Sequence, residues 1–398
     1  MTIWLIEPRD PVIFRDGRPF NASPGARAKS LSFPLPATIA GATRTHAGLD
    51  ANGRFNADRI DELLAKQVRG PVLVELREDG CVQEWLFPAP ADALLLKHDP
   101  YNKKRARIVP LTVVDTPSGA TSNLPAGLAL VVSTEYANAK PHPKAPAFWR
   151  WNRYLSWLSE PEVQDIELEG FGHAGPVRES RMHVSIESGT QTAEDGALFQ
   201  TSGLEFLYAP AEEDEDRPRL ARGQMLGLVV ETDAVLREGL GFLGGERRVV
   251  RWRSGPRQFP ECPPKVRQAI IASRHCRLIL ATPALFTHGY LPDKAKLSRS
   301  GVTASVRAVV NQRYQVVSGW DYQSGRPKPA RRLVPAGSVY FLQLNGNDSD
   351  IGRFVDDIWL QAISDDAQDC RDGFGLALLG VWDGIPKPLV YRAEDDAS

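Results

Sequence analysis

The chain has 398 residues, of which 42% are hydrophobic and 24% charged, and its formal net charge at pH 7 is −1. These values are typical of a globular protein that is long enough for two domains. No apolar run approaches the roughly 18 residues that a membrane-spanning helix needs, so we expect no membrane partner.

The first half of the sequence is predicted to contain strands and helices in turn. An apolar strand leads through a polar turn into a helix that begins at Pro36 and can end at Gly48. In chain order we expect strand 2–14, helix 36–47, strands 71–77 and 81–87, a Pro/Lys-rich insertion, helix 148–158, and strands 182–186 and 204–208.

The charged run 211–219 is typical of a solvated loop and separates the two halves. After it we expect strand 224–231, helix 233–242, strands 248–252, 277–281, 314–318 and 338–344, helix 353–363 and strand 374–381. Each half approximates a β-α-β-β-α-β order with extra strands. The predicted fold class is α+β, with a domain at 1–210 that carries an insertion at about 88–147 and a second domain at 220–398.

The most informative phrase is Phe14-Arg15-Asp16-Gly17-Arg18-Pro19-Phe20, which lies between the first strand and the first helix. Arg15 and Arg18, together with Lys29 and Arg44, surround this strand–helix junction. Helix N-termini and basic loops are places where proteins bind phosphate. The residues alone therefore predict an anion site.

Five later stretches follow this phrase in a fixed order. They are 181–186 with 196–199, 243–248, 283–286 running to 289–292, 319–321 running to 327–329, and 334–341. As an ordered set they resemble the RAMP superfamily of CRISPR proteins, and in particular the third subunit of the type III-B (Cmr) effector complex. The resemblance extends from Ile6 to the Gly-rich stretch near Gly380.

This resemblance implies two ferredoxin-like, RRM-related modules with long loop and hairpin insertions. It also implies a non-catalytic subunit that holds the 5′ repeat-derived tag of crRNA in antiviral defence. The implied protein partners are the large cyclase/polymerase-like subunit and the backbone RAMP subunits, with target RNA contacted only indirectly. No cofactor is implied. The alternative is a metal-independent crRNA-processing endoribonuclease on the same fold, and a scaffold that contacts only protein would leave the basic stretch 294–332 unexplained.

The resemblance favours RNA contact for one set of residues. They are Arg15, Arg18, Lys29, Arg44, Arg181, His183, Gly244, Gly245, Arg247, Arg248, Lys328, Gly373 and Gly375. In the phrase 243–248, paired glycines permit positive φ and a close backbone approach, and arginines can bind phosphate bidentately. Without the resemblance, a helix C-cap followed by a surface arginine pair is the better explanation. With it, we expect Arg15, Arg18, Arg44, Arg247 and Arg248 to converge on one groove.

Two other stretches leave alternatives open. The Gly-rich stretch 373–380 is superficially similar to a dinucleotide fingerprint, but it lies too near the C-terminus for a βαβ unit to follow. It is either a close-packed terminal strand or a loop near RNA. The basic cluster Lys97, Lys103, Lys104, Arg105 and Arg107 contains His98 and Tyr101 and suits either a single-stranded RNA or a solvated loop.

The sequence predicts neither a metal site nor a catalytic residue. Its seven histidines form no HExxH or CxxH pair, and no nucleophile motif or Walker A motif is present. His46 and His183 each lie two residues after an arginine, which is the setting in which a ribonuclease of this superfamily could use a general base.

Charge is segregated along the second half. Nine Lys/Arg and one acid lie between 294 and 332, whereas 348–398 contains twelve acids and four basic residues. Such asymmetry suits an anionic partner on one face and a protein partner on another, or solvated loops. The four cysteines form no CxxC pair and the N-terminus has no signal-peptide pattern, so we expect a cytoplasmic protein.

Overall fold

The structure is a computed structural model that describes residues 1–15, 27–28, 30–97, 102, 104–116, 119–133, 139–208, 224–321 and 326–389. Its largest unit is a nine-stranded sheet in which neighbouring strands run antiparallel. The strands are, in spatial order, β10 (Gly172–His173), β8 (Phe148–Arg150), β4 (Val82–Pro88), β3 (Val68–Leu76), β14 (Gln224–Thr232), β1 (Thr2–Pro8), β16 (Arg248–Ser254) and β15 (Gly239–Leu243), with β13 (Leu207–Tyr208) beside β14.

One face of this sheet is covered by α1 (Pro36–Ala47), which has proline at its first turn and ends before Gly48. Trp4 and Ile6 of β1 alternate toward the helix, where they pack with Ile39. The short helices η1 (Ala57–Arg59) and α2 (Ile60–Ala65) follow α1. This layer fixes the position of the segment that enters α1.

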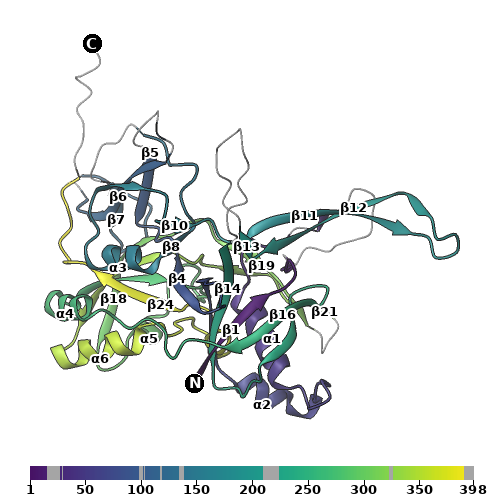
Figure 1. Cartoon of the computed structure of the whole chain (residues 1–398). Coiled ribbons are helices and arrows are strands. Elements are labelled where there is room, and N and C mark those ends of the chain that lie inside the picture. The colour runs from purple at the N-terminus through teal and green to yellow at the C-terminus, as the bar shows by residue number, and fades with distance from the viewer. Residues whose placement is uncertain are drawn as a thin grey trace.

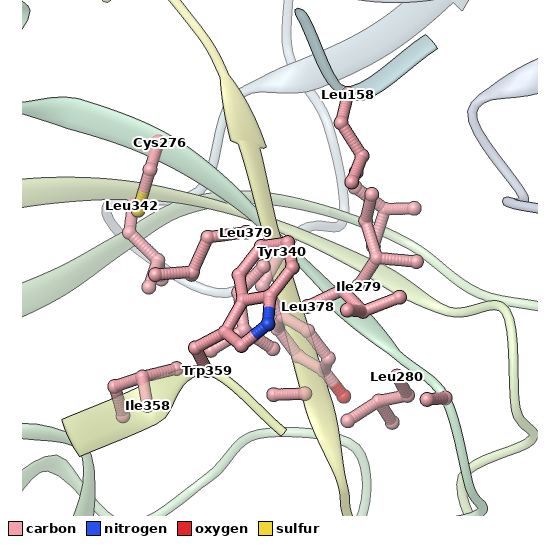
Figure 2. Close-up of a cluster of buried hydrophobic side chains, with 14 of the residues drawn as sticks. Leu158, Cys276, Ile279, Leu280, Tyr340, Leu342, Ile358, Trp359, Leu378 and Leu379 are labelled. Carbon is pink, nitrogen blue, oxygen red and sulfur yellow. The ribbon is translucent and has the colours of Figure 1, made fainter. Parts of the chain in front are cut away.

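The second sheet contains β18 (Thr303–Val310), β23 (Val339–Asn345), β17 (His275–Leu280) and β24 (Ala377–Val381) in that spatial order. The helices around it are α3 (Trp151–Ser159), α4 (Pro264–Ser273), α5 (Lys294–Leu297) and α6 (Asp348–Ile358), whereas α7 (Ala367–Asp372) contacts α1 and β3 of the first sheet. Ile279, Tyr340 and Leu378 lie in its core together with Trp359, the residue that follows α6 (Figure 2). The core also includes Leu158, so α3 joins the first half of the chain to this sheet.

A buried ion pair stabilises the contact between the first half of the chain and the second sheet. Arg277 of β17 donates from Nη1 to Asp92 at 2.6 Å, and both side chains are 2% exposed. Trp157 donates from Nε1 to the second Asp92 oxygen, while Arg277 also donates to the carbonyls of Trp157 and Val381. The network connects four separate segments with nearly all of its donors satisfied inside the protein.

Smaller sheets extend from this body. The insertion forms β5 (Ala93–Lys97), β6 (Arg105–Val114), β7 (Leu130–Ser133) and, later in the chain, β9 (Gln164–Glu167). A long hairpin of β11 (Val177–Ile186) and β12 (Ala193–Glu205) projects as an arm and pairs near its base with β2 (Arg27–Ala28) (Figure 1). The remaining pairs are β19 (Gln315–Val317) with β22 (Arg331–Leu333), and β20 (Trp320–Asp321) with β21 (Arg326–Pro327).

The α+β prediction is confirmed, whereas two ferredoxin-like modules remain an expectation from the resemblance. The predicted helix 233–242 is wrong because this stretch is a loop followed by β15. The predicted helix 353–363 begins earlier, at Asp348, where Asn347 caps it. The strands β14, β15 and β16 follow the charged run that was expected to separate the two domains, yet they belong to the first sheet. All strands of the second sheet come after Ser254.

Candidate nucleic-acid interface

The turn between β15 and β16 meets the segment that follows β1. Gly245 donates its backbone N–H to the carbonyl of Ile13 at 2.7 Å. Gly244 has φ of +73°, and a Cβ there would lie 2.4 Å from the same carbonyl oxygen. Only glycine fits this close approach in a left-handed conformation. The phrase expected to follow a helix is thus a hairpin turn held against the N-terminal segment.

This contact brings arginines from distant parts of the chain together. The carboxylate of Glu246 accepts a hydrogen bond from Arg248 at 2.8 Å and lies 4.0 Å from Arg15 Nη2. Arg247 lies over the ring of Phe242 at 4.6 Å from its centroid, a cation–π geometry. We call Arg15 and the turn 244–248 the arginine turn. The arginine turn contains three guanidinium groups and one carboxylate, so its net charge is positive. The Arg15 side chain is 51% exposed.

The hairpin arm begins beside the arginine turn. Val12 and Leu204 exchange backbone hydrogen bonds, and Ser30 donates its N–H to Ser202 Oγ at 3.0 Å. The segment 11–15 therefore lies between the arm's base and the turn 244–248. Farther along the arm, the His183 ring stacks on Phe199 with centroids 5.2 Å apart.

Arg181 and His183 lie on the same face of the arm. Arg181 forms a bidentate pair with Glu179, at 2.7 and 3.1 Å, which raises the pKa of its guanidinium first by hydrogen bonding and then by charge. His183 Nε2 lies 2.8 Å from Thr201 Oγ1. An aromatic stack is a chemistry to which an unpaired base can add, whereas the Arg181 guanidinium is already paired with Glu179.

Arg44 does not belong to this surface. Its side chain is 8% exposed and pairs with Asp372 at 2.6 Å, and it also donates to the carbonyls of Lys66 and Arg371. A guanidinium that is buried and bonded in this way connects α1 to α7. The expectation that Arg44 contacts RNA is therefore corrected.

Gly373 and Gly375 are likewise buried. A Cβ on Gly373 would lie 2.6 Å from the carbonyl oxygen of Gly70 in β3, and one on Gly375 would lie 3.0 Å from Ser364. Both residues also have positive φ, which glycine adopts without strain. The structure supports the close-packing alternative and removes both glycines from the RNA-facing set.

Lys328 is exposed on the hairpin that contains β19 and β22. Its N–H donates to the carbonyl of Gly319 at 2.8 Å. On the same hairpin, Arg332 lies 5.1 Å from the centroid of the Tyr314 ring, and Tyr314 is 47% exposed. This pair and the pair Phe242–Arg247 were not predicted as sites, since each joins residues whose proximity depends on strand pairing.

In the basic cluster near 97–107, two arginines form ion pairs on the protein surface and several other residues lie outside the described part of the chain. Arg105 and Arg107 of β6 lie beside Glu167 and Asp165 of β9, at 2.9 and 3.8 Å. These cross-strand pairs favour the solvated alternative. Arg18 and Lys29, and also His98, Tyr101 and Lys103, lie outside the described residues.

The part of the chain that the structure describes has neither a metal-binding cluster nor a membrane-spanning helix. Within it, no group of three or more His, Cys, Asp or Glu side chains could hold a metal ion. None of its helices is both long enough and apolar enough to cross a membrane. His46 stacks on Trp252 at 5.0 Å and lies 2.8 Å from the carbonyl of Arg237, which is a packing environment.

Comparison with known proteins gives one family match. A family model described as "CRISPR-associated protein (Cas_Cmr3)" matches residues 4–382. No curated protein matched the sequence.

Three solved structures show the extent of structural similarity. Chains from two cryo-EM structures of the type III-B Cmr-beta complex with cognate target RNA, one of them also bound to AMPPnP, are 15% and 16% identical, with TM-scores of 0.43 and 0.44. In both cases the match covers 85% of this chain and 86% of the other. A chain of the Csm3–Csm4 subcomplex of a type III-A complex is 10% identical with a TM-score of 0.35, covering 87% of this chain and 94% of that one.

Proposed function

Because the chain belongs to the Cas_Cmr3 family of CRISPR-associated proteins, and is thus a type III-B effector subunit, we propose that it binds single-stranded RNA without cutting it. The RNA would be the 5′ repeat-derived tag of crRNA. The observation that carries this proposal is the arginine turn, in which Arg15 lies beside the turn that contains Arg247 and Arg248, more than half of the sequence away along the chain.

The surface has the chemistry that a single strand needs. Arginines bind phosphate. The close backbone approach at Gly244 and Gly245 packs the turn directly against segment 11–15. The stacked His183 and Phe199 offer an aromatic face for a splayed base. Recognition of this kind depends on the shape of the strand and needs no metal.

The experiment that tests this proposal against the nuclease alternative is incubation with repeat RNA. We expect the RNA to stay intact over hours, with and without divalent metal, because the partners of His183 within the described part of the arm are the Thr201 hydroxyl and the Phe199 ring, neither of which is a second general acid or base. Denaturing gels of end-labelled RNA give the readout, with His183→Ala and His46→Ala as controls. Site-specific cleavage that either substitution abolishes would establish the nuclease instead.

We further propose that the chain docks on the large cyclase/polymerase-like subunit and neighbours the backbone RAMP subunits. The segregation of charge in its second half supports separate RNA and protein surfaces. A stable interface would bury about 1,200–2,000 Å² in total. Co-purification of the two subunits should therefore survive nuclease treatment, and its loss after that treatment would mean that only RNA connects them.

A further inference from the structure

Exposed apolar side chains line the outer edge of the nine-stranded sheet. On β15, Leu240 is 68% exposed and Phe242 is 51% exposed, and Val235 in the segment before it is 85% exposed. β15 ends the spatial order of the sheet and pairs only with β16 among the described strands. An open strand edge with apolar side chains is a template for another extended chain.

The direction of these side chains is fixed by the fold. Leu243 on the opposite face is 1% exposed, and a Cβ at Gly241 would lie 2.7 Å from Trp252 Nε1. A shift of β15 by one residue would place Leu240 and Phe242 where only glycine and the buried leucine fit. The two side chains therefore face outward whenever the sheet is formed.

The rim of this edge is positively charged. Arg251 lies directly opposite Leu240 on β16 and is exposed, with no ion pair to any described residue within 4 Å. Arg247 lies over the outer Phe242 ring. The apolar strip is thus bounded by two guanidinium groups.

The nearest carboxylates offset only part of the positive charge of this rim. Glu7 pairs with Arg253 at 2.7 Å and is 5% exposed. Glu238 accepts hydrogen bonds from the backbone and the hydroxyl of Ser254, at 2.9 and 2.7 Å. The pKa of Glu238 is lowered by these hydrogen bonds and then by the charges of Arg253 and Arg251, and Glu246 pairs with Arg248. Because Arg247, Arg248, Arg251 and Arg253 outnumber the carboxylates Glu7, Glu238 and Glu246, a partner that covers the edge would meet a net positive charge.

We propose that the β15 edge binds an extended segment of a partner protein in which apolar side chains alternate with acidic ones. The segment adds a strand to β15, its apolar side chains cover Leu240 and Phe242, and its carboxylates pair with Arg247 and Arg251. The aliphatic Val235 and Leu240 can neither stack on a base nor bind a phosphate, so the apolar strip itself is not part of the RNA surface, with which the edge shares only Arg247. The proposal does not depend on RNA binding.

Site-specific crosslinking in the assembled complex tests this proposal. The photo-crosslinker p-benzoylphenylalanine replaces Leu240 in the full chain, and the complex is purified from its native host through a tag on this chain. We expect a nuclease-resistant adduct with a peptide in which acidic and apolar residues alternate. The same crosslinker in place of Phe55, which is 43% exposed, should not capture that peptide. An RNA adduct, a basic peptide, or no protein adduct at position 240 would overturn the proposal.

Introducing negative or positive charge at the β15 edge gives a second, independent measurement. Leu240→Glu with Phe242→Glu should lower the yield of the co-purified partner about tenfold or more, because like charges then face each other. Leu240→Lys with Phe242→Lys should reduce the yield of the partner by a several-fold smaller factor than the glutamate variant does, since lysines complement the acidic segment. Unchanged unfolding midpoints show that both variants are folded. Equal losses in the two variants, or no loss in either, would contradict the acidic character of the partner.

Discussion

Replacing Asp92 with asparagine should lower the free energy of unfolding by about 3–5 kcal/mol, the largest stability effect that we expect from a single change. The substitution leaves the Arg277 guanidinium, which is 2% exposed, without its counter-charge. It also disturbs the hydrogen bond from Trp157 Nε1. Chemical denaturation followed by tryptophan fluorescence measures the change, because Trp157 lies in the network.

Two controls make this result specific. Glu167→Gln removes an ion pair with Arg105 whose side chains are 58% and 46% exposed, and an exposed pair of this kind contributes only about 0–1 kcal/mol. Asp92→Leu combined with Arg277→Met removes both charges and should be much less destabilising than Asp92→Asn alone. If Asp92→Asn changes stability no more than Glu167→Gln does, the network is not what joins the segments.

Replacing Arg247 and Arg248 together with alanine should weaken RNA binding in a way that depends on salt. If about four phosphates are neutralised, the slope of log affinity against log salt should be about −3 for a single strand. Loss of the two arginines should make this slope shallower by roughly one unit and reduce affinity most at low salt. Fluorescence anisotropy over a series of salt concentrations measures both quantities.

The matched control replaces Arg105 and Arg107 with alanine. These arginines also follow one another at close spacing, but they lie on β6 beside carboxylates of β9. Their loss should leave the slope unchanged. An unchanged slope in the Arg247/Arg248 variant would mean that these two arginines serve packing or a protein partner.

Local signals in the sequence were sufficient to predict some elements. Pro36 and Gly48 define the two ends of α1 because proline fits the first turn and the chain leaves the helix at glycine. The apolar runs at 71–77 and 81–87 correspond to β3 and β4 within a few residues. In these cases the pattern in the chain and the tertiary environment agree.

Local signals failed where strand pairing decides the structure. The stretch 233–242 was predicted as a helix, yet Gly239 and Gly241 weaken a helix, and Gly241 allows β15 to lie against Trp252. β14, β15 and β16 join strands from the start of the chain, and no spacing in the sequence signals such long-range pairing.

The candidate site was only partly predictable for the same reason. Arg15 and the turn 244–248 were expected to lie together, and the structure places them side by side. Arg44 was expected at the surface, but its partner Asp372 is far away in the sequence, so only the fold could show that it is buried. The pairs Phe242–Arg247 and Tyr314–Arg332 likewise depend on strand pairing and turn geometry.

The most direct test of the central claim compares the affinity of the purified chain for two labelled RNAs that differ only in the 5′ repeat-derived tag. We expect the tagged RNA to bind more tightly by about tenfold or more, since base contacts add to a phosphate contribution that both RNAs share. The Arg247→Ala/Arg248→Ala variant should weaken binding of both RNAs. Equal affinity of the wild-type chain for the tagged and untagged RNAs, or no binding of either, would mean that this chain does not recognise the 5′ tag.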